Sequence, residues 1–132
     1  MRTVVVVGMS LAGVRTVEAL RHEGFDGRIV AIGAESHLPY DRPPLSKAVL
    51  RGEADSADVV LRHQGYEDLD LDWRLGRSAT SLDLADRTVV LDGGERVGFD
   101  GLVIATGATA RTMPGAPDLP GLTVLQIGRA HV

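Results

Sequence analysis

Apolar residues at the start of the chain follow the pattern of a strand, then a helix, then a second strand. Residues 3–7 form a continuous β-branched run, which is typical of a central parallel strand covered on both faces. An apolar stripe at every third position then predicts a helix that ends near residues 23–24. The stripe consists of Leu11, Val14, Val17 and Leu20. Residues 28–32 predict the second strand and complete a β-α-β unit.

The turn between the first strand and the helix has the composition of a phosphate-binding turn. Gly8 permits a tight exit from the strand, and Gly13 lets the helix pack closely against it. Ser10 stands where such turns usually have glycine, but serine is also small and its hydroxyl can donate to a phosphate. The N–H groups of Ser10, Leu11 and Ala12 would form an anion site at the start of the helix. The turn predicts nucleotide binding, with an ordinary β-α turn as the alternative.

A carboxylate follows the second strand at the distance that a dinucleotide site requires. In such sites an acid about twenty residues beyond the glycine turn binds a ribose hydroxyl. Glu35 is the candidate in this sequence. The alternative is a solvated acid in a loop.

The segment 38–47 departs from a simple nicotinamide dehydrogenase. It reads Leu-Pro-Tyr-Asp-Arg-Pro-Pro-Leu-Ser-Lys, and its prolines predict a stiff, extended loop before a short helix that starts near Leu45. A loop of this kind presents Arg42 and Lys47 from a constrained backbone, close to an acidic cofactor.

The rest of the chain contains further β patterns. Residues 69–75 alternate with period two and predict a strand. Residues 102–107 predict a buried strand that stops at a Thr-Gly turn. Three short patterns separated by turns predict an antiparallel meander, at residues 77–82, 87–91 and 95–99.

Composition and charge exclude several classes of protein. The 132 residues fit one domain, and the net charge of −4 with scattered basic residues argues against binding to nucleic acid or to an anionic membrane. The absence of cysteine excludes disulfides and thiolate chemistry, and His22, His37 and His63 lack the spacing of metal ligands. No signal-peptide pattern and no span of ~20 apolar residues is present, so we expect a cytoplasmic protein.

Two features of the sequence together resemble one particular family of proteins. They are the segment 39–47 and the late strand that ends in Ala-Thr-Gly. From Thr3 to about Leu125 the chain resembles the amino-terminal part of the FAD-dependent ferredoxin reductases. This group contains putidaredoxin reductase, rubredoxin reductases and the reductase components of Rieske-type dioxygenases. The resemblance implies an α/β, Rossmann-like FAD-binding fold of three layers, with a parallel central sheet and an antiparallel β-meander. It also implies FAD as cofactor, NAD(P)H as electron donor, and a ferredoxin- or rubredoxin-type iron–sulfur protein as acceptor.

The resemblance assigns roles to particular residues. Glu35 would bind the adenosine ribose, and Arg42 and Lys47 would lie on the flavin side, with Lys47 near the reactive edge. Ala79 would touch the adenine end of FAD, and Arg111 would lie near the cofactor or be exposed. The Thr-Gly turn that would lie next to the cofactor consists of Thr106 and Gly107. The residues at the FAD pyrophosphate would be Gly8, Ser10, Leu11, Ala12 and Gly13.

The last residues depart from the resemblance. The related reductases continue after the Pro120–Gly121 position with a Leu-Arg-Thr motif and a second glycine-rich turn, but here Leu125 is followed by Gln-Ile-Gly-Arg-Ala-His-Val. The codons CAG-ATC-GGA-AGA-GCA-CAC-GTC would encode this heptapeptide, and they contain the common sequencing-adapter string AGATCGGAAGAGCACACGTC. We therefore expect residues 1–125 to be an incomplete FAD-binding domain and residues 126–132 to be a non-native tail. We expect these 132 residues alone to bind FAD weakly or not at all, and not to turn over NADH.

Two other functions agree with parts of the sequence. A fragment of an NAD-binding dehydrogenase would explain the glycine turn, but not the proline-rich loop or the late Ala-Thr-Gly strand. A stand-alone nucleotide-binding or interaction module would gain weight if the last seven residues were genuine. Ligand preference among FAD, NAD and ADP distinguishes these alternatives.

Overall fold

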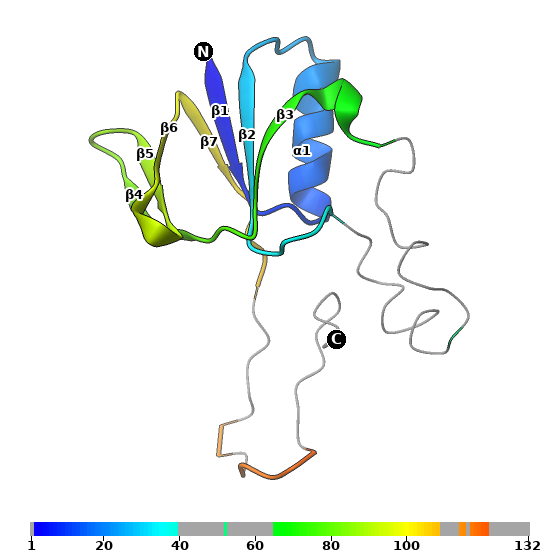
Figure 1. The fold of residues 1–132 in the computed structure, drawn as a ribbon, viewed down its shortest axis with the longest axis vertical. Coiled ribbons are helices and arrows are strands. Elements are labelled where there is room, and N and C mark those ends of the chain that lie inside the picture. Colours follow the sequence, from blue (N-terminus) through cyan, green and yellow to red (C-terminus); the bar gives the residue numbers. More distant parts are fainter. Residues whose placement is uncertain (1, 40–51, 53–64, 109–113, 116, 122–132) are drawn as a thin grey trace.

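The computed structural model of the chain describes residues 2–39, 52, 65–108, 114–115 and 117–121 (Figure 1). Arg42, Lys47, Arg111 and the tail 126–132 lie outside the described residues, as does the helix expected near Leu45.

A four-stranded parallel sheet forms the centre of the described chain. The order of its strands is β3-β2-β1-β7. Their bounds are Thr3–Val7 for β1, Arg28–Gly33 for β2, Leu71–Leu75 for β3 and Gly101–Ile104 for β7. β1 and β2 are buried over nearly their whole length, because both faces of the sheet are covered. All four carboxyl ends lie at one edge of the sheet, the lower edge in Figure 1.

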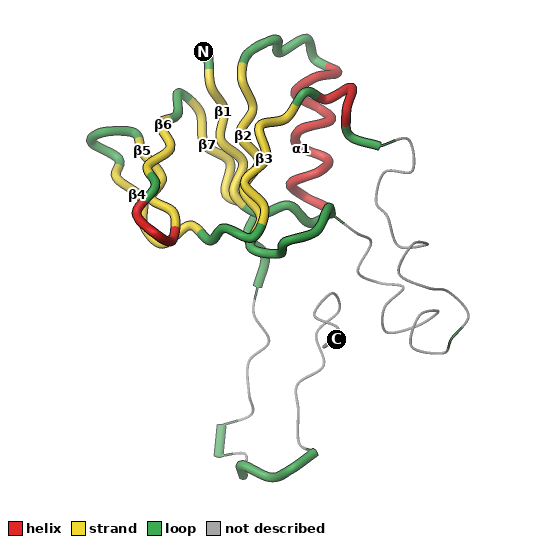
Figure 2. The backbone as a smooth tube through the Cα atoms, in the orientation of Figure 1, coloured by secondary structure: helices red, strands yellow, loops and turns green. Residues whose placement is uncertain are grey.

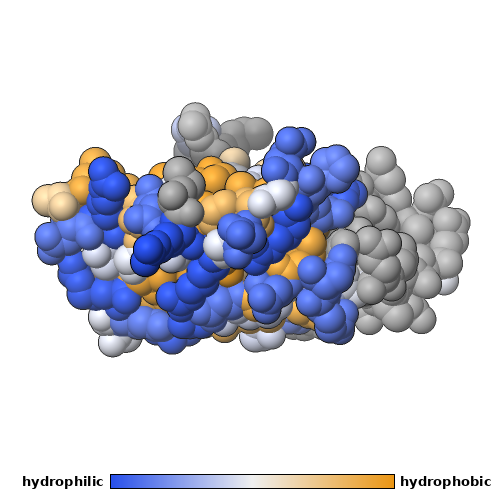
Figure 3. Space-filling view, turned by 90° about the horizontal axis from the view of Figure 1, so that it is seen from above, coloured by the Kyte–Doolittle hydropathy of each residue, from blue (hydrophilic) through white to orange (hydrophobic). Residues whose placement is uncertain are grey.

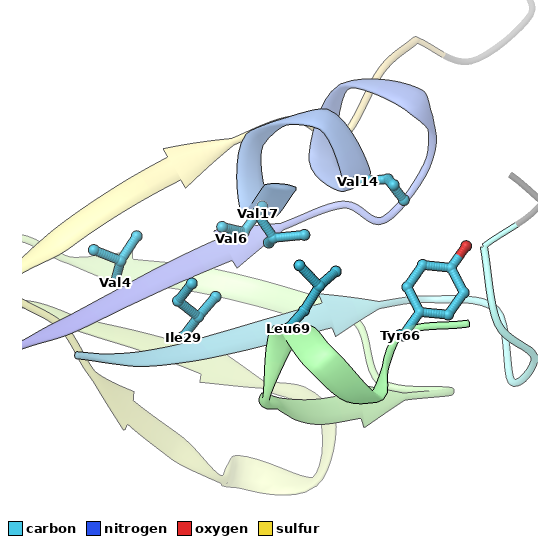
Figure 4. Close-up of a cluster of buried hydrophobic side chains, with 7 residues drawn as sticks. All are labelled: Val4, Val6, Val14, Val17, Ile29, Tyr66 and Leu69. Carbon is cyan, nitrogen blue, oxygen red and sulfur yellow. The ribbon is translucent and has the colours of Figure 1, made fainter. Parts of the chain in front are cut away.

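Helix α1 (Leu11–His22) connects β1 to β2 and covers one face of the sheet (Figure 1). Val14 and Val17 point from the helix into a buried cluster with side chains of the sheet, as Figure 4 shows. The other members of this cluster are Val4, Val6, Ile29, Tyr66 and Leu69. The predicted β-α-β unit is confirmed.

One member of the predicted apolar stripe lies outside the core. Leu11 is 54% exposed, whereas Val14 and Val17 are completely buried. A step of three residues falls about 60° short of a full helical turn, so a stripe with this spacing moves away from the buried face. Leu11 is also the first residue of α1, beyond the end of the strand that the helix covers.

The opposite face of the central sheet is covered by an antiparallel meander of strands β4 (Ala79–Asp83), β5 (Thr88–Leu91) and β6 (Arg96–Gly98) (Figure 2). Val5, Val7, Val30 and Ile32 of the sheet form a second buried cluster with residues of the meander, namely Val89, Leu91 and Val97. A 3₁₀ turn, η4 (Asp92–Gly94), joins β5 to β6. Helix, sheet and meander make three layers, so the predicted fold class is confirmed.

Two predicted strands differ from the observed ones. The strand expected from residue 69 begins at Leu71, because Leu69 ends a 3₁₀ turn, η3 (Glu67–Leu69), and Asp70 has a left-handed backbone with φ of 50°. The strand expected to be buried over residues 102–107 ends at Ile104, and none of its residues is fully buried. β7 pairs only with β1 within the described residues, so one of its edges lacks a neighbouring strand there.

Figure 3 looks along the strands from the end of the molecule where the amino terminus lies. Apolar residues lie in the middle of this view and at its upper left edge, and polar residues cover much of the rest. No helix in the part of the chain that the structure describes has the length and apolar character needed to cross a membrane.

Candidate functional site

Three turns meet where the parallel strands end. The Gly8 N–H, just after β1, donates to the Ile32 carbonyl of β2 at 2.8 Å. The Ala105 N–H, just after β7, donates to the Val7 carbonyl of β1 at 2.7 Å. The carboxyl edge of an open parallel sheet, where the loops diverge, is where such folds bind their ligands.

Gly8 and Gly13 have no room for a side chain. A Cβ on Gly8, whose φ is +102°, would lie 2.1 Å from the Ala105 carbonyl oxygen, and a Cβ on Gly13 would lie 1.9 Å from the Gly8 carbonyl oxygen. Any larger residue at either position would therefore have to displace backbone. The two glycines bring β1, α1 and the end of β7 together, as the motif predicts.

The amino terminus of α1 opens onto this junction. Ser10 is the N-cap residue, its side chain makes no capping hydrogen bond, and the first turn contains no acidic residue. Within the part of the chain that the structure describes, no oxygen accepts a hydrogen bond from the N–H groups of Ser10, Leu11 or Ala12. These donors and the positive end of the helix dipole favour an anion at this position.

Glu35 lies in the loop after β2, beside the glycine turn. A Cβ on Gly33, the last residue of β2, would lie 3.6 Å from the Cβ of Met9 in the turn. The Glu35 carbonyl accepts a hydrogen bond from Gly76 N–H at 2.9 Å, and its carboxylate lies 3.0 Å from the His37 imidazole. The structure therefore brings Glu35 to the same edge of the sheet as the anion site.

Thr106 lies beside the glycine turn, and Ala79 lies in the meander. The Thr106 nitrogen is 2.9 Å from the position that a Cβ on Gly8 would take, and Gly107 follows it in an exposed segment. Ala79 is the exposed first residue of β4 and pairs with Leu91. It follows the linker in which the Arg77 N–H donates to the Gly33 carbonyl at 3.1 Å, so its strand starts near the Glu35 loop.

Comparison with known proteins identifies the family. The pyridine nucleotide-disulphide oxidoreductase family matches residues 2–130, almost the whole chain. The chain belongs to this family. The predicted resemblance to ferredoxin reductases is also confirmed, because the similar proteins within this oxidoreductase family include several of them.

The similar oxidoreductases are much longer proteins. The ferredoxin reductase component of chlorobenzene dioxygenase from Cupriavidus sp. (strain PS12) is 46% identical over 125 residues, which make up 93% of this chain and 30% of that protein. The ferredoxin–NAD(+) reductase subunit of the benzene 1,2-dioxygenase system from Pseudomonas putida is 41% identical over 125 residues, with the same coverages of 93% and 30%. The chain thus spans less than a third of these relatives.

A solved structure with the same fold is the covalent complex of putidaredoxin reductase with putidaredoxin. Its TM-score is 0.81 at 35% identity, and the match covers 86% of this chain and 27% of that one. A ferredoxin reductase from Rhodopseudomonas palustris matches with a TM-score of 0.78 at 34% identity, covering 86% and 28%. These likenesses confirm the Rossmann-like arrangement of the family.

A row of charged side chains, which the sequence analysis missed, joins the central sheet to the meander. Asp72 on β3 is bonded to Arg28 and Arg74, and Arg74 Nε lies 3.1 Å from Glu95 Oε2. Burial alone would raise the pKa of Asp72, but hydrogen bonds from Arg28 and Arg74, together with their charges, outweigh it and lower that pKa. Opposite charges at residues 72 and 74 were the available sequence signal, but they do not reveal Arg28 on β2 or Glu95 just before β6.

Arg77 extends this row along the linker between β3 and β4. Its guanidinium lies 2.9 Å from Asp92 Oδ1 and 3.0 Å from Glu95 Oε1. The hydrogen bond to Asp92 raises the pKa of Arg77, and the same bond lowers the pKa of Asp92. These contacts fasten the linker whose N–H groups hold the Glu35 loop. Among the described residues, no group of three or more His, Asp or Glu side chains is arranged to hold a metal ion.

Proposed function

We propose that this chain is the FAD-binding portion of an NAD(P)H-dependent ferredoxin or rubredoxin reductase. The observation that carries the proposal is the turn formed by Gly8, Gly13 and the amino terminus of α1, in which neither glycine has room for a side chain. Its free N–H groups suit a pyrophosphate. The names of similar proteins, among them ferredoxin–NAD(+) reductase components of dioxygenase systems, support the choice of FAD and NAD(P)H.

The pyrophosphate of FAD would lie over the glycine turn. The N–H groups of Ser10, Leu11 and Ala12 would donate to its oxygens, and the small Ser10 would let the backbone approach it. Gly8 and Gly13 allow the strand, turn and helix to lie close together. Ser10 would give up no capping hydrogen bond, because its side chain makes none in the structure.

The two ends of FAD would extend to either side of this turn. Glu35 would accept hydrogen bonds from the adenosine ribose, and Ala79 would contact the adenine. Thr106 and Gly107 would lie beside the cofactor, and Arg42 and Lys47 would face the flavin, where a cation stabilises negative charge. When bound, FAD supplies the conversion of a hydride from NAD(P)H into single electrons. We propose a ferredoxin- or rubredoxin-type protein as the acceptor, as the names of the similar reductases suggest.

The test is an NMR titration of the 132-residue chain with FAD, NAD and ADP. Weak binding remains measurable by this method even at a dissociation constant of about 1 mM, or about −4 kcal/mol. We expect FAD and ADP to shift the amide signals of Ser10, Leu11 and Ala12. Preference for NAD over FAD would instead support a dehydrogenase fragment, and binding of FAD or ADP that leaves these amides unshifted would overturn the proposal.

A charge variant tests the anion site without disturbing the fold. Ser10→Asp places a good N-cap residue at a position that already begins the helix, so the chain should remain folded. The added carboxylate would repel a pyrophosphate, and we expect FAD affinity to fall by about tenfold. Arg15→Ala makes the same change in net charge at an exposed position further along α1 and should leave the affinity within about twofold. Equal affinities of the two variants would contradict the assignment.

We further propose that residues 126–132 are a non-native tail. The support is the match of their possible codons to a sequencing adapter. Resequencing the genomic locus decides the matter, since genomic reads with the same codons would refute it. The cytoplasmic location stays a prediction from the sequence.

A further inference from the structure

The outer edge of β7, the edge that faces away from β1, has no partner strand within the residues that the structure describes. The Ala105 N–H, just after β7, donates to the Val7 carbonyl of β1. Successive N–H groups of a strand point to alternate edges, so the backbone N–H and carbonyl groups of Leu102 and Ile104 face outward. The residues of β7 make no hydrogen bonds beyond the ladder with β1. Ile104 is 64% exposed, so this end of the outer edge is open to solvent.

The other sheet edges of the described chain carry features that discourage pairing with a further strand. β3, at the opposite edge of the central sheet, carries the charged residues Asp72 and Arg74. In the meander, β4 has a register shift between Ala79 and Ser81, and β6 is three residues long and carries Arg96. Charge, irregularity and shortness are means by which natural edge strands avoid adding a neighbour. The sequence of β7 is Gly-Leu-Val-Ile, with neither charge nor proline, so its outer edge is suited to accept a strand.

We propose that the outer edge of β7 pairs with the same edge of a second copy of this chain, in antiparallel orientation about a twofold axis at Val103. In this register Leu102 of each copy lies opposite Ile104 of the other, and each such pair exchanges two backbone hydrogen bonds. A twofold contact requires a surface that is complementary to itself, and this edge meets the requirement because all its outward-facing groups find partners. The two central sheets become one continuous sheet.

Side chains and charges agree with this register. Leu102 packs against the buried cluster between the sheet and the meander, and Ile104 lies on the same face because it is two residues further along the strand. The pairing therefore places two apolar side chains together and covers the exposed Ile104. Asp100 lies opposite Thr106 of the second copy rather than opposite a second Asp100, so like charges are not brought together. The contact does not depend on nucleotide binding.

Sedimentation equilibrium of the 132-residue chain tests the inference. We expect a monomer–dimer equilibrium with a dissociation constant on the order of 100 µM, because a four-residue edge makes an interface at the weak end of the range. Hydrogen exchange followed by NMR locates the contact. The amides of Leu102 and Ile104 should exchange about threefold more slowly at about 1 mM protein than at about 50 µM, because fewer molecules are then monomeric.

Two variants of Ile104 and one control identify the edge. Ile104→Lys places a charge at the outer edge, and Ile104→Pro removes an outward-facing N–H without removing a bond to β1. Each should raise the dissociation constant by at least about tenfold, as expected for an edge that carries a charge or a proline. Leu84→Lys is the matched control, because Leu84 is 73% exposed in the turn between β4 and β5. It should leave the dissociation constant within about twofold.

Two outcomes would overturn the inference. A chain that stays monomeric at about 1 mM does not pair with itself, and the edge is then left to a strand of a longer polypeptide or of another protein. Equal dimerisation of Ile104→Lys and Leu84→Lys means that the copies meet through another surface. Ile104→Lys keeps this comparison decisive even if Ile104→Pro does not fold, because it changes a side chain that is already exposed. Failure of FAD to bind would affect the proposed function and not this inference.

Discussion

Gly13 leaves the least room for a side chain among the described glycines, and this makes it the sharpest test of how α1 packs on β1. Alanine would favour the helix by up to about 1 kcal/mol on propensity alone. Its Cβ would lie 1.9 Å from the Gly8 carbonyl oxygen, however, so the backbone would have to move. We expect Gly13→Ala to lower the free energy of unfolding by about 1–3 kcal/mol. Urea unfolding followed by the fluorescence of Trp73, the single tryptophan, measures it.

The control for this prediction is Arg15→Ala on the same helix. Arg15 is exposed, and among the residues that the structure describes it pairs only with Glu18 one turn away, so its loss should change the stability by less than about 0.5 kcal/mol. A Gly13→Ala chain as stable as the original would show that the turn is looser than its geometry indicates.

Individual residues could be predicted from the sequence where local geometry dictates them. Gly13 is such a case, because its Cβ would meet the Gly8 carbonyl of the same strand–turn–helix junction. The positive φ of Gly8 is also local, but the Ala105 carbonyl that its Cβ would meet lies far along the chain. Arg21 is the opposite case, since it donates to backbone carbonyls up to 49 residues away along the chain. The contact of His37 with Glu35 could not be predicted from periodicity either, because the loop has no periodic pattern.

At the level of elements, Asp100 fastens the amino end of β1 to the turn between β6 and β7. Its Oδ2 accepts hydrogen bonds from the N–H groups of Thr3 and Arg2, both at 2.9 Å. The bond from Thr3, followed by that from Arg2, lowers the pKa of Asp100 in the folded chain. Because the folded pKa lies below the unfolded value of about 3.9, the carboxylate stabilises the fold above that value. This stabilisation disappears as the pH falls through the folded pKa.

We therefore expect Asp100→Asn to be less stable than the original chain at neutral pH. The difference should shrink as the pH falls from about 7 to about 3, because the original chain then loses its own carboxylate. Urea unfolding at a series of pH values measures the effect. Asp118→Asn is the control, since Asp118 is exposed and makes no hydrogen bond or ion pair within the described residues. A constant difference at every pH would contradict the electrostatic explanation.

Strands that are buried on both faces could be predicted from the pattern of hydrophobic residues. β1 and β2 were predicted nearly to the residue, because a continuous apolar run between turn residues leaves few alternatives. The predicted start of β3 was wrong, because the alternation of apolar and polar residues at positions 69–70 does not reveal the left-handed backbone of Asp70. β7 was expected to be buried, but exposure of an apolar strand depends on its neighbours in the sheet, which its own residues do not specify.

For the whole molecule, the three layers follow from two buried clusters on opposite faces of one sheet. Alternate side chains of β1 and β2 point to opposite faces, so Val4 and Val6 contact α1 while Val5 and Val7 contact the meander. The order of the strands did not follow from the pattern alone. In the structure the late strand β7 pairs with β1. The hydrophobic pattern of residues 102–107 could not predict this pairing, because the pattern is compatible with a strand at either edge of the sheet.

The described molecule contains a single strand-to-helix glycine turn of the phosphate-binding kind, and this limits what the chain can catalyse alone. Hydride transfer requires the donor and the flavin to be held about 3–3.5 Å apart, which takes a binding site for each nucleotide. We therefore expect the 132-residue polypeptide, supplied with FAD, to oxidise NADH no faster than free FAD does. The loss of NADH absorbance in the presence of a one-electron acceptor measures the rate, with the benzene dioxygenase reductase subunit of Pseudomonas putida as the positive control. A polypeptide that is yellow after purification and reduces the acceptor would contradict this prediction, because the remaining residues would then have to supply the second site.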